Sequence, residues 1–261
     1  MRREPLFPNS LTSGFDVSVA QGSLSATHWK ALASAHQFVI IKCGSGNDSP
    51  DPNYRHNINA ARSAGLIVGT YHYVNVLPDA PAHPGRSPEE QALAHFRLAS
   101  YRSGDLLPWA DVEFPNHTEW DTWKLPKGGQ RADFIADFIV RYVGYYAKIS
   151  GVGMGFYSYS AWVKAARLAD SARHDVLALM PFWQADASVA SMPSSLPGGA
   201  GPWRRADLFQ WTNSLRTPNG ISLDGNVCAP STLTRLTGPT ALLASSLASA
   251  ADLARQGVRT P

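Results

Sequence analysis

The chain has 261 residues, 44% of them hydrophobic and 16% charged, which suits one sizeable domain with a core of its own. Its net charge is only +3 and its 23 basic residues form no run, which argues against nucleic-acid binding. No apolar run approaches the roughly 18 residues of a membrane span, so we expect a soluble protein without membrane insertion. The two cysteines, Cys43 and Cys228, are too few for a disulfide framework and are expected to be buried thiols.

Strand-like and helix-like segments alternate along the first half of the chain. Continuous apolar runs predict the strands, and capping residues predict the helix ends. Ser25 or Thr27 is the expected N-cap of the first helix, Gly65 closes the second, and Ser87 caps the third. In chain order we expect a strand at 13–19, a helix at 25–35, a strand at 38–43, a helix at 53–65, a strand at 66–74, a Pro-rich loop at 78–88 and a helix from 87.

The second half has shorter elements and a distinct tail. We expect a fourth strand at 106–116, a long helix at 130–149 and short strands at 151–159, 180–186 and 207–213. The Ser/Pro/Gly stretch at 188–202 is interpreted as a surface loop, because strand-like sequence resumes after it. In the tail, one helical face carries apolar residues and predicts a packing helix; these residues are Leu243, Leu247, Ala250 and Ala254.

This order of elements predicts an α/β fold. Strands buried on both faces and joined by helices indicate a parallel sheet. About eight such units in a chain of this length favour a closed TIM-like β/α barrel over an open doubly wound sheet. The later connections look too short for full helices, so we expect an irregular barrel in a single domain. Its parts are an N-terminal arm at 1–12, the barrel at 13–237 and a C-terminal helix at 238–261 that packs on the barrel.

The fourth strand carries two acids one residue apart, Asp111 and Glu113, in the run LLPWADVEFPN. Residues i and i+2 of a strand share a face, so the two carboxyl groups should stand side by side although they resist simultaneous ionisation. Asp16, Asp186 and Asp224 fall at or near other expected strand ends. In a β/α barrel the chemistry lies at the C-terminal strand ends, so the sequence predicts a carboxylate site there.

Aromatic residues accompany these acids and would offer flat apolar faces to sugar rings. Trp183 is predicted to be such a platform, with core packing as the open alternative. His72, His95 and His117 lack a shared face or ligand spacing, so we expect them to be structural and expect no metal. The accompanying aromatic residues are Tyr71, Tyr73, Trp120, Trp123, Tyr157, Tyr159, Trp183 and Trp211.

Six motifs resemble, in order, those of glycoside hydrolase family 25, the muramidases or lysozymes of bacteria, phages and fungi. They span roughly residues 13–226 and read GFDVSVAQG, FVIIKCGSGNDSPDPNYRHNINAARSAGLIVGTYHYV, PWADVEF, FYSYSAWV, PFWQADA and LFQWTN…GISLDGN. The resemblance implies an irregular β/α barrel that needs no cofactor. It also implies hydrolysis of the β-1,4 bond between N-acetylmuramic acid and N-acetylglucosamine, with peptidoglycan glycan strands as the partner.

The resemblance also assigns roles to residues. It implies Asp16, Asp111, Glu113 and Asp224 as catalytic-site acids, with Glu113 as the general acid. We expect Asp111, if ionised, and desolvation at the partly apolar strand end to raise the pKa of Glu113. Asp16 and Asp224 are expected to stabilise positive charge or position water. Retention through the substrate's acetamide is favoured, and single displacement by water stays open. The expected substrate-binding residues are Tyr71, Tyr73, Tyr157, Trp183, Asp186, Gln210 and Asn226.

Two other classes of protein stay open. The chain could be a carbohydrate-binding barrel without activity, or a metal-dependent hydrolase using His72 with the acids Asp16, Asp111 and Glu113. The N-terminus has no apolar region, so no Sec signal peptide is expected. A monomer that reaches the bacterial wall through a holin-type or other export route is expected, as a phage lysin or as a secreted effector.

Overall fold

The computed structural model describes residues 11–47, 49–77, 87–122, 124–186, 189, 191–217, 220–238 and 240–255. Almost all of the predicted N-terminal arm, most of the Pro-rich loop, and Trp123 lie outside these residues. The strands are β1 (Thr12–Val17), β2 (Phe38–Ser45), β3 (Ser49–Pro50), β4 (Ile67–Asn75), β5 (Trp109–Phe114), β6 (Gly155–Tyr159), β7 (Phe182–Ala185), β8 (Leu208–Arg216) and β9 (Ser222–Cys228).

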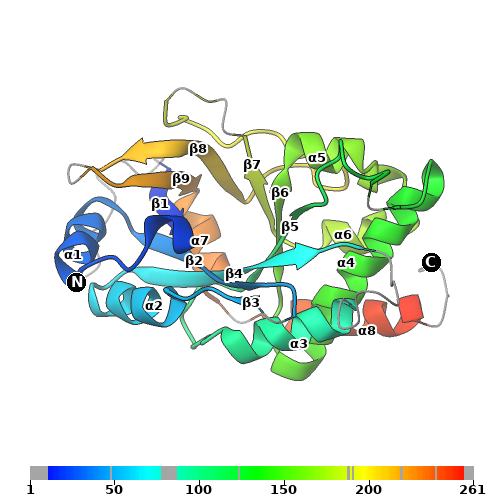
Figure 1. The fold of residues 1–261 in the computed structure, drawn as a ribbon, viewed down its shortest axis with the longest axis horizontal. Helices are drawn as coiled ribbons and strands as arrows, with labels where there is room; N and C mark the ends of the chain where they lie inside the picture. Colours follow the sequence, from blue (N-terminus) through cyan, green and yellow to red (C-terminus); the bar gives the residue numbers. More distant parts are fainter. Residues whose placement is uncertain are drawn as a thin grey trace.

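Eight of these strands close into a barrel, as predicted (Figure 1). They follow the order β1-β9-β8-β7-β6-β5-β4-β2, and a parallel pairing of β1 with β2 completes the circle. The short strand β3 pairs only with β2 and lies outside the circle. The fold is therefore a single α/β barrel whose strand ends meet at two rims.

Within the closed barrel, one strand departs from the predicted parallel sheet. Strand β9 runs antiparallel to both of its neighbours, β1 and β8. Only residues 217–221 join β8 to β9. A parallel crossover needs a dozen or more residues, so a connection of this length forces the chain to turn back. This strand is what makes the barrel irregular.

The helices begin where their capping residues indicated. The Ser25 side chain accepts a hydrogen bond from the His28 N–H, so Ser25 rather than Thr27 is the N-cap of the first helix. Ser87 and Glu90 form a capping box at the start of the third. The helices are α1 (Ala26–Ala35), α2 (Tyr54–Ser63), α3 (Pro88–Leu98), α4 (Gly129–Ser150), α5 (Ser160–Ala165), α6 (His174–Ala178), α7 (Pro230–Leu236) and α8 (Ala241–Arg255), with short 3₁₀ turns at Val19–Gln21 and Leu168–Asp170.

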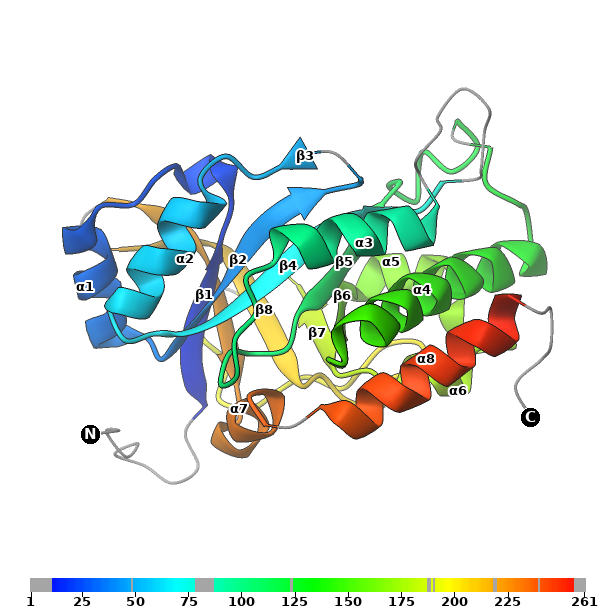
Figure 2. The ribbon, with the colours of Figure 1, turned by 90° about the horizontal axis from the view of Figure 1, so that it is seen from below.

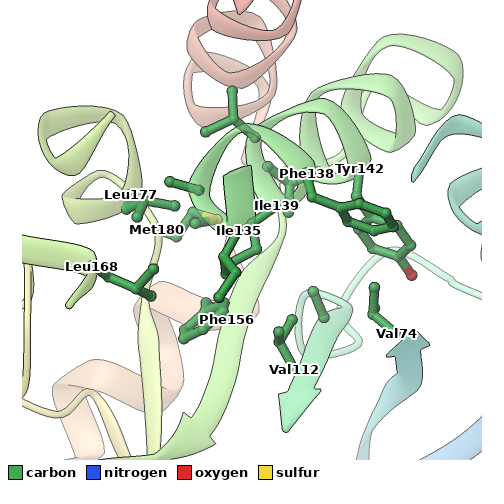
Figure 3. Close-up of a cluster of buried hydrophobic side chains, with 14 of the residues drawn as sticks. Val74, Val112, Ile135, Phe138, Ile139, Tyr142, Phe156, Leu168, Leu177 and Met180 are labelled. Carbon is green, nitrogen blue, oxygen red and sulfur yellow. The ribbon is translucent and has the colours of Figure 1, made fainter. Parts of the chain in front are cut away.

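The core has three parts, one inside the barrel and two between the strands and the helices. Inside, buried rings such as Trp109 and Trp183 fill the barrel, and Leu233 and Leu236 of α7 join them. One outer part lies under α1 and α2, and a larger one lies under α3, α4 and α8 on another side of the barrel (Figure 2). Figure 3 shows the larger one, where Ile135 of α4 points toward Phe156 of β6. Both buried cysteines are free thiols, as expected.

The C-terminal helix α8 packs against the long helix α4. Its Leu247 and Ala251 are fully buried, while the predicted face residue Leu243 is only partly buried. The two helices approach closely at Gly144, where an added Cβ would lie 2.2 Å from the Cβ of Ala251 and 2.4 Å from the carbonyl oxygen of Leu247. No described helix is both long and apolar enough to cross a membrane.

Gly144→Ala should therefore destabilise the fold by roughly 1–3 kcal/mol, because the new methyl group must push α8 away from α4. Urea unfolding followed by circular dichroism measures this loss. The matched control is Gly129→Ala at the start of α4, where nothing lies within 4 Å of an added Cβ. Equal stability of the two variants would show that α8 does not depend on this contact.

Candidate active site

Four acids from three strands meet at the rim formed by the C-terminal ends of the parallel strands. Asp16 lies near the end of β1, and Asp111 and Glu113 lie near the end of β5. Asp224 lies near the start of β9, and the antiparallel direction of that strand places it directly opposite Asp16 in the β1–β9 ladder. The electrostatic influence of Asp224 and Glu113 on Asp16 shows that the structure brings these predicted acids together.

A buried hydrogen-bond network fixes the Asp16 carboxylate. Its Oδ2 atom accepts from Gln210 Nε2 at 2.9 Å and from Asn226 Nδ2 at 2.7 Å. The Tyr157 hydroxyl donates to Gln210 Oε1 at 2.7 Å, and Trp183 Nε1 donates to Asn226 Oδ1 at 2.8 Å. Both amide groups are therefore oriented by a second donor. In this structure Gln210, Asn226 and Tyr157 hold an acid of the site in place.

The structure contradicts the prediction that Trp183 is a sugar platform. Its side chain is 1% exposed. Its ring packs against Tyr157 at 4.5 Å, Trp109 at 5.6 Å and Tyr71 at 6.0 Å between centroids. The ring points into the barrel, where side chains of neighbouring strands surround it. Trp183 therefore belongs to the core, and it contributes to the site through its indole N–H.

Other aromatic rings at the rim remain accessible. Tyr159 is 36% exposed at the end of β6, and its ring stands edge-on to Tyr157 at 6.2 Å. Tyr73 of β4 is partly buried, whereas Tyr71 is only 9% exposed. Of the two tyrosines of β4, Tyr73 therefore offers the more open ring face to a ligand. Tyr159, which did not belong to the expected binding set, is more open than Tyr71 or Tyr157.

Lys42 is a residue of the site that the sequence analysis missed. Its Nζ lies 4.7 Å from the ring centroid of Tyr73 and 5.9 Å from that of Tyr71. The sequence did contain a feature that pointed to it, because Lys42 is the one charged residue in the apolar run FVIIKC. Phe38 and Ile40 point into the barrel, and the two-residue repeat of a strand gives Lys42 the same direction. Its positive charge lowers the pKa of both Asp111 and Glu113.

Burial raises the pKa values of both acids of β5, Asp111 and Glu113. Desolvation raises the pKa of Glu113 to about 7, with Lys42 acting against this shift and Asp224 adding to it. Desolvation and then the charge of Glu113 raise the pKa of Asp111 well above its usual value. Of the two expected causes, desolvation is the main one that raises the pKa of Glu113, whereas a charge on Asp111 is not among its causes. Desolvation and the charge of Glu113 disfavour the ionised form of Asp111.

Asp16 and Asp224 form a second coupled pair across the rim. Burial is the main cause that raises the pKa of Asp16, and Asp224 raises it further, while hydrogen bonds from Asn226 and Gln210 oppose the shift. Burial also raises the pKa of Asp224, and its hydrogen bond with Asp16 lowers it. Two carboxyl groups in this contact share a proton more easily than they both ionise.

Asp186 follows β7 and is partly buried. Its backbone N–H donates to the carbonyl oxygen of Gln210 at 3.0 Å, which places it beside the hydrogen-bond network of Asp16. The role expected for its side chain in substrate binding stays a prediction.

The buried histidines are structural, but two of them do share a contact. The rings of His72 and His95 stack at 5.0 Å, a contact between β4 and α3 that the spacing of these residues in the sequence did not predict. His72 Nε2 lies 2.6 Å from the Gly46 carbonyl oxygen, and His95 Nδ1 lies 2.8 Å from the Tyr142 hydroxyl. Desolvation lowers the pKa of His72 to about 4. Within the described ranges, no group of three or more His, Cys, Asp and Glu side chains could hold a metal ion.

A closed β/α barrel with a group of acids at its C-terminal rim is an arrangement typical of barrel glycoside hydrolases. The sequence profile described as Glycosyl hydrolases family 25 matches residues 15–220, and the chain belongs to this family. No curated protein sequence matches significantly.

Solved structures with the same fold come from bacteria, fungi and phages. A bacterial lysozyme from Streptomyces coelicolor is 20% identical with a TM-score of 0.65, covering 89% of this chain and 98% of its own. A muramidase from Trichobolus zukalii is 24% identical with a TM-score of 0.65, covering 88% and 99%. The catalytic domain of endolysin ply40 from bacteriophage P40 of Listeria monocytogenes is 19% identical with a TM-score of 0.62, covering 87% and 98%. At these identities the likeness concerns the fold.

The raised pKa of Glu113 predicts a stability gain for Glu113→Gln. A carboxyl group whose pKa rises from 4.5 to about 7 on folding destabilises the folded chain as the pH rises through this interval. At pH 8 the variant should be more stable than the parent by on the order of 2–3 kcal/mol, and the difference should vanish below pH 4.5. Urea unfolding across this pH range measures the effect. A difference that does not change with pH would contradict the shifted pKa.

Trp183→Ala should lower the free energy of unfolding by roughly 3–5 kcal/mol, because it empties the centre of the barrel. Chemical denaturation measures the loss. Trp211→Ala is the matched control, because the Trp211 ring is only partly buried and its removal should cost less. A stable Trp183→Ala variant with weakened sugar binding would instead support the interpretation of Trp183 as a stacking surface for sugar rings.

Proposed function

We propose that this chain hydrolyses the β-1,4 bond between N-acetylmuramic acid and N-acetylglucosamine in peptidoglycan and so degrades the bacterial cell wall. The observation that carries this proposal is the acid pair of β5, in which burial holds the pKa of Glu113 at about 7. A group with this pKa can donate its proton at neutral pH, as a glycosidic leaving oxygen requires. Membership in glycosyl hydrolase family 25 supports the same reaction.

Glu113 is the proposed general acid. Burial and then the charge of Glu113 raise the pKa of Asp111 well above its usual value, so simultaneous ionisation of the two acids is disfavoured. Within the described chain the buried Asp111 Oδ1 atom has no hydrogen-bond partner. A substrate that presents a polar group to this oxygen would satisfy it, and the acetamido group of the sugar is of the right kind. Asp111 therefore positions the acetamido group in the proposed reaction.

The pair of Asp16 and Asp224 faces the developing positive charge of the sugar ring. A pair that shares one proton still carries one negative charge, which stabilises an oxocarbenium-like transition state. If the acetamide held by Asp111 attacks from within, the configuration at the anomeric carbon is retained. Direct attack by a water molecule held by Asp16 or Asp224 would invert it.

The accessible rings of Tyr73 and Tyr159 are the proposed stacking surfaces for the glycan strand. The Lys42 Nζ lies over the Tyr73 ring, where its cation stabilises the ring position. A glycan strand of the wall is then the partner of this rim, and the wall is the place of action. The barrel that this chain shares with the catalytic domain of the ply40 endolysin supports this assignment.

The test is digestion of purified peptidoglycan followed by mass analysis of the fragments. The parent should release fragments with new reducing ends on N-acetylmuramic acid. Glu113→Gln should lose at least the 10²–10⁴-fold that a general acid contributes, while it still cosediments with the wall, because the shape is kept and the proton source is removed.

Glu89→Gln is the matched control, since Glu89 lies on α3 in an ion pair with Arg141 and is not one of the four acids at the rim. Glu113→Gln activity within about tenfold of the parent would overturn the assignment of the acid. A parent that binds the wall and releases no fragments would instead identify a carbohydrate-binding barrel.

A further inference from the structure

A second concave site lies at the end of the barrel opposite the acids. It is a cavity of about 460 Å³. Part of its wall comes from Met180 and Pro181, which directly precede β7, and from Asp207, which directly precedes β8. Residues before a parallel strand lie at the N-terminal rim of a barrel, whereas Asp111 and Glu113 lie at the C-terminal rim. The two sites are therefore separated by the length of the barrel.

Trp203, one of the residues that line this cavity, is tightly packed. The Trp203 ring stacks against Phe156 and Phe182, each at 4.6 Å between centroids. Its Nε1 donates to the Met180 carbonyl oxygen at 2.9 Å. Because these contacts tie the loop before β8 to two strands, the cavity exists without a bound ligand. Beside it Leu179 is 52% exposed, which adds an apolar surface to the mouth.

Three arginines line the cavity, Arg204, Arg205 and Arg235, and Asp207 is the one negatively charged residue among its lining residues. Asp207 Oδ1 accepts from Arg235 Nη2 of α7 at 2.6 Å, and its Oδ2 accepts from the Phe182 backbone N–H at 3.0 Å. Arg205 lies farther from the same carboxylate, with Nε at 3.9 Å and a side chain that is 78% exposed. Arg204 is exposed, and none of the ion pairs among the described residues involves it. The site thus holds an excess of positive charge around a preformed hollow.

We propose that this cavity binds a phosphate group, with Arg204 and Arg205 as the ligand-binding side chains and Arg235 as the anchored third cation. Guanidinium groups match phosphate oxygens in geometry and donate paired, charge-assisted hydrogen bonds to them. Asp207 holds Arg235 at the shorter distance, while the exposed side chains of Arg204 and Arg205 can turn toward the ligand. The phosphate can be a free ester or a link of an anionic phosphodiester polymer. This inference does not depend on the reaction proposed for the opposite rim.

The test uses two probes, glycerol 3-phosphate and a poly(glycerol phosphate) chain, titrated into the full protein by calorimetry at low salt. Arg204→Ser/Arg205→Ser should weaken binding of both probes by about tenfold or more, because each charged hydrogen bond contributes on the order of 1.5–3 kcal/mol. Stronger binding of the polymer than of the monomer, compared per phosphate, would assign the site to a polymer. Equal binding per phosphate would assign it to a free ester.

The matched control is Lys30→Ser/Arg97→Ser, which removes the same charge from exposed positions on α1 and α3. This control should bind within about twofold of the parent, since screened charges this far apart act weakly. Equal weakening in both double variants would show that net charge alone attracts the probes, and would overturn the proposal. So would a parent protein that binds neither probe at millimolar concentration.

If the double variant does not fold, Arg204→Ser alone serves, because Arg204 is exposed. Its loss of binding should then be about half of that of the pair on a logarithmic scale. Hydrolysis of short soluble glycan fragments at the opposite rim should stay unchanged in every cavity variant. Lost hydrolysis with unchanged phosphate binding would count against the proposed reaction and leave the cavity site intact.

Discussion

The ladder between β1 and β9 is the contact on which both the fold and the site depend. It closes the barrel with an antiparallel strand, and the same register sets Asp16 opposite Asp224. Asn226 lies two residues farther along β9, so its amide reaches the Asp16 carboxylate from the same side. Weakening this ladder would open the barrel and separate two acids at once. Closure of the sheet and assembly of the site are therefore a single structural event.

Burial is the second constraint, and it decides the protonation of the site. Each acid is taken out of water by the rings that fill the barrel, and the resulting desolvation is the largest cause of every raised carboxyl pKa at the rim. Such burial costs folding free energy that a surface carboxylate does not. The charge of Lys42 offsets part of this cost, because it stabilises the ionised forms of Asp111 and Glu113. The burial that raises the pKa of Glu113, and so suits it to donate a proton, thus lowers the stability of the fold.

Local features of the fold could be predicted from the sequence, whereas features set by neighbours in space could not. Ser25 and Ser87 cap helices through residues three positions away, so their pattern is visible in the chain. The side-by-side placement of Asp111 and Glu113 follows from strand geometry alone. The burial of Trp183 depends on rings from three other strands, which no spacing in the sequence reveals. The same holds for the raised pKa values of the β5 pair, since desolvation depends on how deeply the fold buries each carboxyl group.

The two ends of the barrel serve different chemistry because different elements close them. At the C-terminal rim the parallel strands carry the acids Asp16, Asp111 and Glu113 near their ends, beside the partly accessible rings of Tyr73 and Tyr159. At the N-terminal rim α7 covers the barrel, with Leu233 and Leu236 packed into the interior core. The outer side of the same helix presents Arg235 to the cavity beside Asp207. One short helix therefore seals the hydrophobic interior and carries a cation of the second site, so the cavity keeps its shape as long as the barrel is closed. A ligand held there would stabilise the closed barrel without touching the acids, because it would bind only the folded arrangement of α7 and β8.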